Sequence, residues 1–266
     1  MRERIARRAA AATAILGTLL TANAWAEQQR FITCPVYRDT DAGRKSGCWL
    51  ADNSASGQRF DVSQAPTKPD WNHEVLVEGE VSATQDNACG GVVLNPVRVS
   101  VLPGTCTRHM IPAEGFKGRT FVLPKRNIQP LSQPRSAPAG PFTSRTFYLF
   151  FDFNRSFLVY QLDDYLLDQA AAYILAANPK KVIVTGFAAT EPSNVSGREI
   201  AETQAIARTR AEGIAESLRR LGVSAGRIEV RSRARALPVD AEDSDGVLEA
   251  SRRRVEITLE RRPLIR

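Results

Sequence analysis

A proline-rich segment in the middle of the 266-residue chain constrains its fold more than any other feature. The prolines of this segment are separated by serine, glutamine, alanine and glycine, and they are Pro124, Pro130, Pro134, Pro138 and Pro141. Proline has no backbone N–H to donate, and it pushes the preceding residue out of helical geometry, so the segment cannot build a helix or a sheet ladder. We therefore predict a semi-rigid linker over residues 124–142 between two domains.

The first 26 residues have the pattern of a secretory signal peptide. Four arginines precede an apolar run from Ala9 to Ala22, and Ala24-Trp25-Ala26 supplies the small residues of a cleavage site. The run is shorter than the ~20 residues of a membrane helix, and no later segment qualifies, so we expect no transmembrane segment after cleavage. An uncleaved anchor is the alternative. A lipoprotein is disfavoured because the residues just before Cys34 are not small. We predict a periplasmic protein, and association with the outer membrane or cell wall stays open.

Part of the basic charge of the chain belongs to this signal. The whole sequence has a formal charge of +7, and removal of four arginines and one glutamate with the signal lowers it to +4. Because the chain is exported, the remaining charge does not indicate a nucleic-acid partner. The oligomeric state is left open by the sequence.

All four cysteines lie ahead of the linker, at Cys34, Cys48, Cys89 and Cys106. An even number of cysteines in an exported chain predicts two disulfide bonds. Three pairings are possible, and we favour pairing of neighbours, Cys34 with Cys48 and Cys89 with Cys106, because it closes short loops. In the chain-entropy model, loops of this size contribute roughly 3 kcal/mol each. A metal site is the alternative, and it is disfavoured because there is no Cys-x-x-Cys pair and the only two histidines are His73 and His109.

Residues 27–123 are predicted to form a small, disulfide-containing, mostly-β domain. Runs rich in valine and bounded by Gly, Asn, Asp and Pro indicate strands over residues 74–82, 92–102 and 119–123. An outer-membrane barrel needs at least eight strands of ~10 residues, which this short region does not supply. The first domain resembles no family that we recognise.

Residues 143–262 show a different periodicity. Strands are predicted over residues 147–151, 182–185, 228–232 and 255–259, and a polar loop over 190–198. The first helix, over residues 158–177, is ended by Asn178-Pro179, and the second, over 199–221, is capped by Gly222. The order β-α-β-α-β-β predicts an α+β fold in which helices cover one face of a sheet.

Several strings of this second domain resemble the OmpA-like peptidoglycan-associated family, the type also found at the C-terminus of OmpA and MotB. In chain order they are Phe151-Asp152-Phe153, Ala177-Asn178-Pro179, Val184-Thr185-Gly186, Arg210-Ala211 with Ile214, Leu221-Gly222-Val223, Arg227-Ile228, Pro238-Val239 and Arg253-Arg254-Val255-Glu256-Ile257. Their order and spacing carry the resemblance, which covers about 40 per cent of the chain. It implies the OmpA-like sandwich fold.

The resemblance also implies non-covalent binding of the peptidoglycan stem peptide, through an Asp and an Arg that grip its diaminopimelate residue. The family's Asp position holds Ala189, whereas its Arg is present as Arg210. A guanidinium fork suits a carboxylate ligand; the alternative is an exposed helical arginine paired with Glu202 or Glu216. Loss of one charge-assisted hydrogen bond at position 189 costs about 1.5 to 3 kcal/mol, so binding by the usual pair should be weak.

Other residues could replace the missing carboxylate or add contacts. The loop after Ala189 is about six residues longer than in the family, and Glu191 in this loop is a better candidate than Glu199, whose position at a helix start has its own stabilising role. Arg253 and Arg254, near the family's groove, are candidates for contact with an anionic wall polymer or a stem-peptide carboxylate. Most other arginines of this domain are expected on solvated faces.

The sequence carries no catalytic constellation and indicates no enzyme and no cofactor. Neither histidine lies in a nucleophile or metal-ligand pattern, and no phosphate-binding loop or Gly-x-Ser-x-Gly motif occurs. Two functions remain. The first is a cell-envelope protein whose second domain binds peptidoglycan, with weakened affinity. The second is a protein-interaction module that keeps the OmpA-like fold as a scaffold in an envelope assembly.

Overall fold

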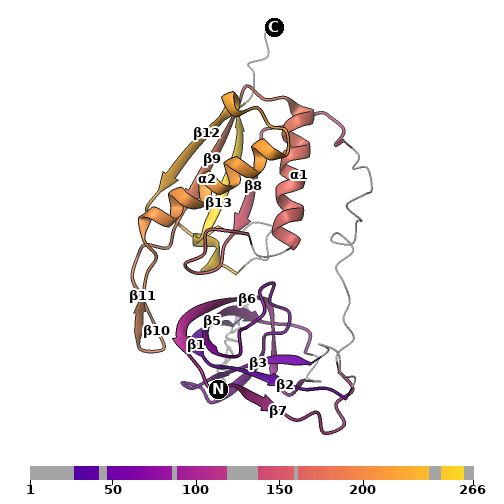
Figure 1. Ribbon diagram of the computed structural model, residues 1–266, viewed down its shortest axis with the longest axis vertical. Helices are drawn as coiled ribbons and strands as arrows, with labels where there is room; N and C mark the ends of the chain where they lie inside the picture. Colours follow the sequence, from indigo (N-terminus) through magenta and orange to yellow (C-terminus); the bar gives the residue numbers. More distant parts are fainter. Residues whose placement is uncertain are drawn as a thin grey trace, which may run out of the picture.

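The structure, a computed structural model, describes residues 27–41, 47–85, 89–118, 137–158, 161–239 and 247–260. The predicted signal peptide, the strand expected over residues 119–123 and most of the predicted linker lie outside these ranges. Figure 1 shows the two domains, with the first below the second. The described residues contain no helix that is long and apolar enough to cross a membrane.

The described part of the first domain is a seven-stranded sheet with the order β1-β5-β6-β4-β3-β2-β7. The strands are β1 (Gln28–Thr33), β2 (Pro35–Arg38), β3 (Cys48–Asn53), β4 (Gln58–Asp61), β5 (His73–Val81), β6 (Val92–Thr105) and β7 (His109–Ile111). The prediction of a mostly-β domain is confirmed. Only β5 and β6 were predicted among these strands, because the others have three to six residues and are too short to show a clear alternation.

The expected pairing of the cysteines is wrong. The disulfides join Cys34 to Cys106 and Cys48 to Cys89, with Cα–Cα distances of 5.7 and 5.9 Å. The reason is the order of the strands: β1 and β6 both pair with β5, so Cys34, just after β1, and Cys106, just after β6, flank the start of the same strand. Neighbours in sequence are separated because the chain crosses the sheet between them.

The second domain has a four-stranded sheet with the order β12-β9-β13-β8. Its main elements are β8 (Thr146–Phe150), α1 (Gln161–Ala177), β9 (Lys181–Phe187), α2 (Gln204–Arg220), β12 (Ile228–Arg233) and β13 (Arg254–Glu260). Both helices pack on one face of the sheet (Figure 1), around a core that includes Phe151, Ile174, Val184 and Leu218. The predicted α+β class and strand-helix order are confirmed. Short 3-10 turns lie at Ala225–Arg227 (η3) and Ala250–Arg252 (η4).

The segment before α2 differs from the prediction. Part of the expected polar loop is a hairpin of β10 (Ser193–Val195) and β11 (Arg198–Ile200), so α2 begins at Gln204 rather than at Glu199. Asn194 and Glu199 pair across this hairpin. The end of α2 is as expected: Gly222 has φ +98°, and its N–H donates to the carbonyl of Arg219.

The two domains pack directly against each other instead of being held apart. Phe153 and Val195 of the second domain join Ile32, Leu76 and Leu102 of the first in one buried apolar cluster. The β10–β11 hairpin extends from the second domain to β1 (Figure 1), where the hydroxyl of Ser196 accepts a hydrogen bond of 3.0 Å from the N–H of Ile32.

Buried polar contacts add to this interface at the end of β8. Arg98 donates to Oδ1 of Asp152 at 2.8 Å, and the Thr67 hydroxyl donates to Oδ2 at 2.6 Å. The N–H of Phe153 donates to the Ser100 hydroxyl at 2.8 Å. Asp152 therefore connects its own domain to the first one.

Candidate functional site

The position of Arg210 follows from the close packing of α2 on β9. Gly186 faces α2, and a Cβ at this glycine would lie 1.9 Å from the carbonyl oxygen of Ala207. Only glycine leaves room for this approach. Arg210, one helical turn after Ala207, is thereby brought beside the end of β9, where it is fully buried.

The guanidinium of Arg210 is saturated by groups of the protein itself. Its two terminal nitrogens contact the two carboxylate oxygens of Glu202, at 2.9 and 2.5 Å. The remaining donors reach the main-chain oxygens of Arg155 at 2.8 Å, Phe187 at 3.0 Å and Asp152 at 3.3 Å. Arg210 is therefore not an exposed helical arginine, and it has no donor left for a ligand. Its partner Glu202 is one of the two glutamates that the sequence offered.

Glu202 is bound from several sides. Its carboxylate accepts hydrogen bonds from the main-chain N–H of Asn154 at 2.8 Å and of Ala189 at 3.0 Å, in addition to those from Arg210. Burial alone would raise the pKa of this carboxyl, but the hydrogen bond and charge of Arg210 outweigh that effect and hold the pKa below its ordinary value of 4.5. Glu202 is therefore a charged group in the interior of the protein.

Ala189 is one of the residues that line a cavity of about 120 Å³. The cavity is lined by Arg30, Phe153, Ala189, Thr190, Glu191, Pro192, Ser193, Ile200, Ala236, Glu249 and Arg252. Arg30 comes from β1 and donates to the Ser193 hydroxyl at 3.0 Å, so the cavity lies between the two domains.

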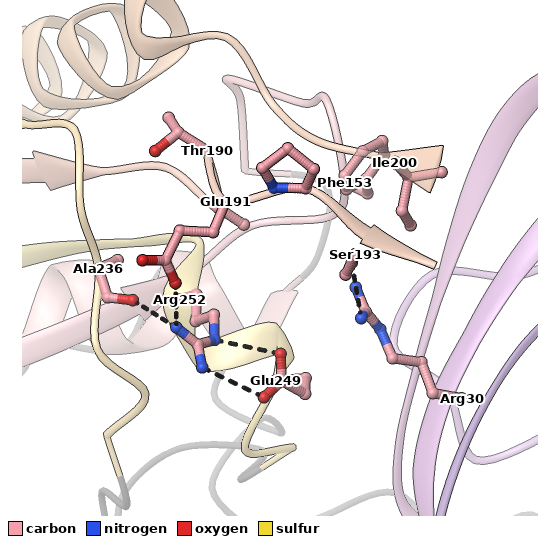
Figure 2. A pocket seen from close by; sticks show the side chains of 11 residues that line it. Arg30, Phe153, Thr190, Glu191, Ser193, Ile200, Ala236, Glu249 and Arg252 are labelled. Atoms are coloured by element: carbon pink, nitrogen blue, oxygen red, sulfur yellow. Dashed lines mark hydrogen bonds and ion pairs between the residues drawn. The ribbon is translucent and has the colours of Figure 1, made fainter. Parts of the chain in front are cut away.

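Glu191 lines this cavity without reaching Arg210. Its carboxylate is 2.7 Å from Nε of Arg235 and 3.7 Å from Nη1 of Arg252. Figure 2 shows Arg252 between Glu191 and Glu249. The carboxylate that meets Arg210 is that of Glu202, which the sequence offered only as a partner of an exposed arginine. No helical spacing predicts this pair, because Glu202 lies before the start of α2 and the packing of that segment brings it onto Arg210.

Arg253 and Arg254, the candidates for contact with an anionic wall polymer or a stem-peptide carboxylate, are both buried inside the protein. Arg253 is fully buried and donates to both carboxylate oxygens of Glu78 in β5. Arg254 is 4% exposed; it donates to Glu256 and to the main-chain oxygen of Leu237, each at 2.8 Å. The sequence predicts both arginines at the start of a strand, but it does not indicate that Arg253 pairs with Glu78 of the first domain.

Among the described residues, the one cluster of metal-ligand types consists of Cys48, Asp61 and Cys89. The two cysteines are bonded to each other, so their sulfur atoms are not thiolate ligands. His73 lies 3.2 Å from Asp70, and His109 is in β7.

Comparison with known proteins identifies the second domain. The model of the OmpA family matches residues 150–253. This domain belongs to the OmpA family. The first domain is matched by no family model, and no curated protein matches the chain. We refer to residues 150–253 and their flanking strands as the OmpA-family domain.

Several solved structures resemble the OmpA-family domain. The peptidoglycan-associated lipoprotein of Burkholderia pseudomallei is 25% identical, with 42% of this chain and 89% of that chain covered and a TM-score of 0.33. The cell wall anchor of the T6SS from Pseudomonas aeruginosa is 26% identical, covering 38% and 67%, with a TM-score of 0.29. The OmpA-like domain of FopA1 from Francisella tularensis subsp. tularensis SCHU S4 is 18% identical, covering 43% and 70%, with a TM-score of 0.32.

Proposed function

We propose that this chain is an exported cell-envelope protein in which the OmpA-family domain serves as a scaffold for protein contacts, the first of them with its own β domain. The observation that carries the proposal is the internal saturation of Arg210 by Glu202. A guanidinium whose donors all have partners inside the fold offers no free fork to a stem peptide. Ala189 supplies no carboxylate in its place.

The contact between the domains supports the same proposal. Glu78, Arg98 and Ser100 of the β domain bind Arg253, Asp152 and Phe153, all within or next to the end of the OmpA-family sheet. The end of this sheet is thus already used for a contact with a protein domain. The lengthened β10–β11 hairpin adds a projecting element, of which Asn194 and Glu199 are exposed.

A photo-crosslinking amino acid at Asn194 tests this function in cells. We expect a discrete adduct with an envelope protein, and no such adduct when the crosslinker replaces Glu212, an exposed residue of α2. Equal labelling at both positions, or no protein adduct at Asn194, would contradict a scaffold role for the hairpin.

Release of the mature chain with Glu27 as its first residue would establish export, as cleavage after Ala26 predicts.

Peptidoglycan binding with reduced affinity is the second candidate. It is favoured by the match of residues 150–253 to the OmpA family and by the cavity beside Ala189, into which Glu191 brings a carboxylate. Here a stem peptide would have to enter between the domains. The periplasmic location, with attachment to the cell wall or outer membrane, is common to both candidates.

Sedimentation with purified sacculi separates the two. The scaffold function predicts that the oxidised mature protein stays in the supernatant and that Ala189→Asp does not change this, because Glu202 still occupies Arg210. Reduced-affinity binding predicts saturable sedimentation of the native protein, with an increase for Ala189→Asp of about ten- to a hundred-fold in affinity, equivalent to one restored charge-assisted hydrogen bond.

A further inference from the structure

Four hydrogen-bond donors from three separate segments converge on the carboxylate of Glu202. Two belong to the guanidinium of Arg210, at 2.9 and 2.5 Å, and two are the main-chain N–H groups of Asn154 and Ala189, at 2.8 and 3.0 Å. An ordinary salt bridge needs only the guanidinium. An arginine fork combined with two main-chain N–H groups is a receptor for a carboxylate of any origin.

The donors are held in place by the fold and not by Glu202 alone. Asn154 has φ +55°, a left-handed conformation that Asn tolerates better than most residues, and this turn aims its N–H at the site. The guanidinium of Arg210 is fixed by the carbonyls of Arg155 and Phe187 and lies 5.1 Å from the centroid of the Phe151 ring. The receptor should therefore persist when the side chain of Glu202 is removed.

The interdomain cavity lies next to this receptor. Ala189 lines the cavity and also donates its N–H to Glu202, and Phe153, a second lining residue, directly precedes Asn154. The side chain of Glu202 thus lies in the protein interior, next to this cavity. Without that side chain, a small solute in the cavity would have a short path to the four donors.

We propose that Glu202 is the built-in ligand of a carboxylate-binding site formed by Arg210, Asn154 and Ala189, and that the site accepts a free small carboxylate once the Glu202 side chain is absent. In the native chain an external carboxylate must displace Glu202. Because Glu202 is tethered beside the site, it competes at a high effective concentration. Glu202 therefore sets how strongly this groove can hold any carboxylate ligand.

Chemical rescue of the oxidised, mature Glu202→Ala variant tests the proposal, since acetate has the atoms that this substitution removes. The melting temperature is measured at pH 7 in about 100 mM sodium acetate and in sodium chloride of equal ionic strength. If acetate binds with a Kd of about 10 mM, it favours the folded state roughly tenfold, and the melting temperature rises by about 3 to 6 °C over the value in chloride. The native protein should show no difference between the two salts.

Three controls make the result specific. Acetamide, which has no charge, should not rescue Glu202→Ala. Acetate should not stabilise Glu212→Ala, in which an exposed glutamate is lost, and it should lose its effect in the double variant Glu202→Ala/Arg210→Met. If Glu202→Ala is unfolded in chloride, acetate must restore its circular dichroism spectrum.

Equal melting temperatures in acetate and chloride, equal rescue by acetamide, or an unfolded variant that acetate does not restore would each overturn the proposal. Since this experiment contains no sacculi and no partner protein, its outcome is independent of the scaffold function proposed above.

Discussion

Glu78 of β5 and Arg253, immediately before β13, form a fully buried ion pair between residues 175 positions apart in the sequence. Arg30 of β1 donates to the same carboxylate at 3.1 Å. The pair lies at the interface of the two domains, so the charge of an OmpA-family residue is neutralised by the first domain. Without the first domain, Arg253 would lose the carboxylate that neutralises it, whereas Glu78 would keep only Arg30.

Removal of one member of this pair should be strongly destabilising. For Glu78→Ala we expect a loss of about 3 to 5 kcal/mol in the free energy of unfolding, because Arg253 is left buried without its counter-charge. Urea denaturation of the oxidised protein measures the loss. The exposed control Glu212→Ala should change stability by less than about 0.5 kcal/mol. A similarly small effect for Glu78→Ala would show that the interface does not hold the domains together.

Acid should weaken the protein through its two buried glutamates. Burial would raise the pKa of Glu78, but Arg253 and Arg30 outweigh it and lower the pKa below 4.5, as Arg210 does for Glu202. A lowered folded-state pKa gives stability that is present above the unfolded value of about 4.5 and is lost as the pH falls through the folded value.

The Glu202→Gln variant should therefore lose less stability than the native protein between about pH 4.5 and pH 3. The two slopes should differ by up to about 1.4 kcal/mol per pH unit, the effect of one titrating group. Urea unfolding curves over this range provide the measurement. Identical slopes would mean that the pKa of Glu202 is the same in the folded and the unfolded protein.

The disulfide pairing can be checked by mass spectrometry of a non-reduced digest. We expect peptides that join Cys34 to Cys106 and Cys48 to Cys89. The two cysteines of each bond are 72 and 41 residues apart in the sequence. For loops of this length the chain-entropy model gives a stabilisation of about 4 kcal/mol per bond. The Cys48→Ser/Cys89→Ser variant should accordingly melt at a lower temperature, and peptides joining Cys34 to Cys48 would refute the pairing.

Gly186 should not tolerate a side chain. A Cβ at this position would lie 1.9 Å from the carbonyl oxygen of Ala207, so Gly186→Ala must push α2 away from β9 and disturb Arg210. We expect a loss of about 2 kcal/mol or more. Gly226→Ala is the matched control, because a Cβ there meets nothing within 4 Å and the effect should be near zero. Comparable stability of the two variants would show that α2 does not pack as closely on β9 at Gly186 as the Ala207 contact requires.

Local patterns predicted the OmpA-family domain well and the first domain poorly. In the second domain, Asn178-Pro179 and Gly222 act within a few residues of where they stand in the chain, so the helix ends followed from the sequence. In the first domain, β2, β4 and β7 have only three or four residues and are held by partners across the sheet. The start of α2 was also missed, because Arg198–Ile200 pairs with Ser193–Val195 instead of continuing the helix.

The candidate site shows the same division. The sequence by itself determined which chemical groups are available: Ala189 without a carboxylate, Arg210 with its fork, and a longer segment between them. Only the tertiary structure decided where the charges are used. It places Glu202 on Arg210 and Glu78 on Arg253, and it closes the disulfides between strands distant in sequence. The physical reason is that a buried charge takes its partner from whatever the packing brings within hydrogen-bond distance, and sequence separation does not report that distance.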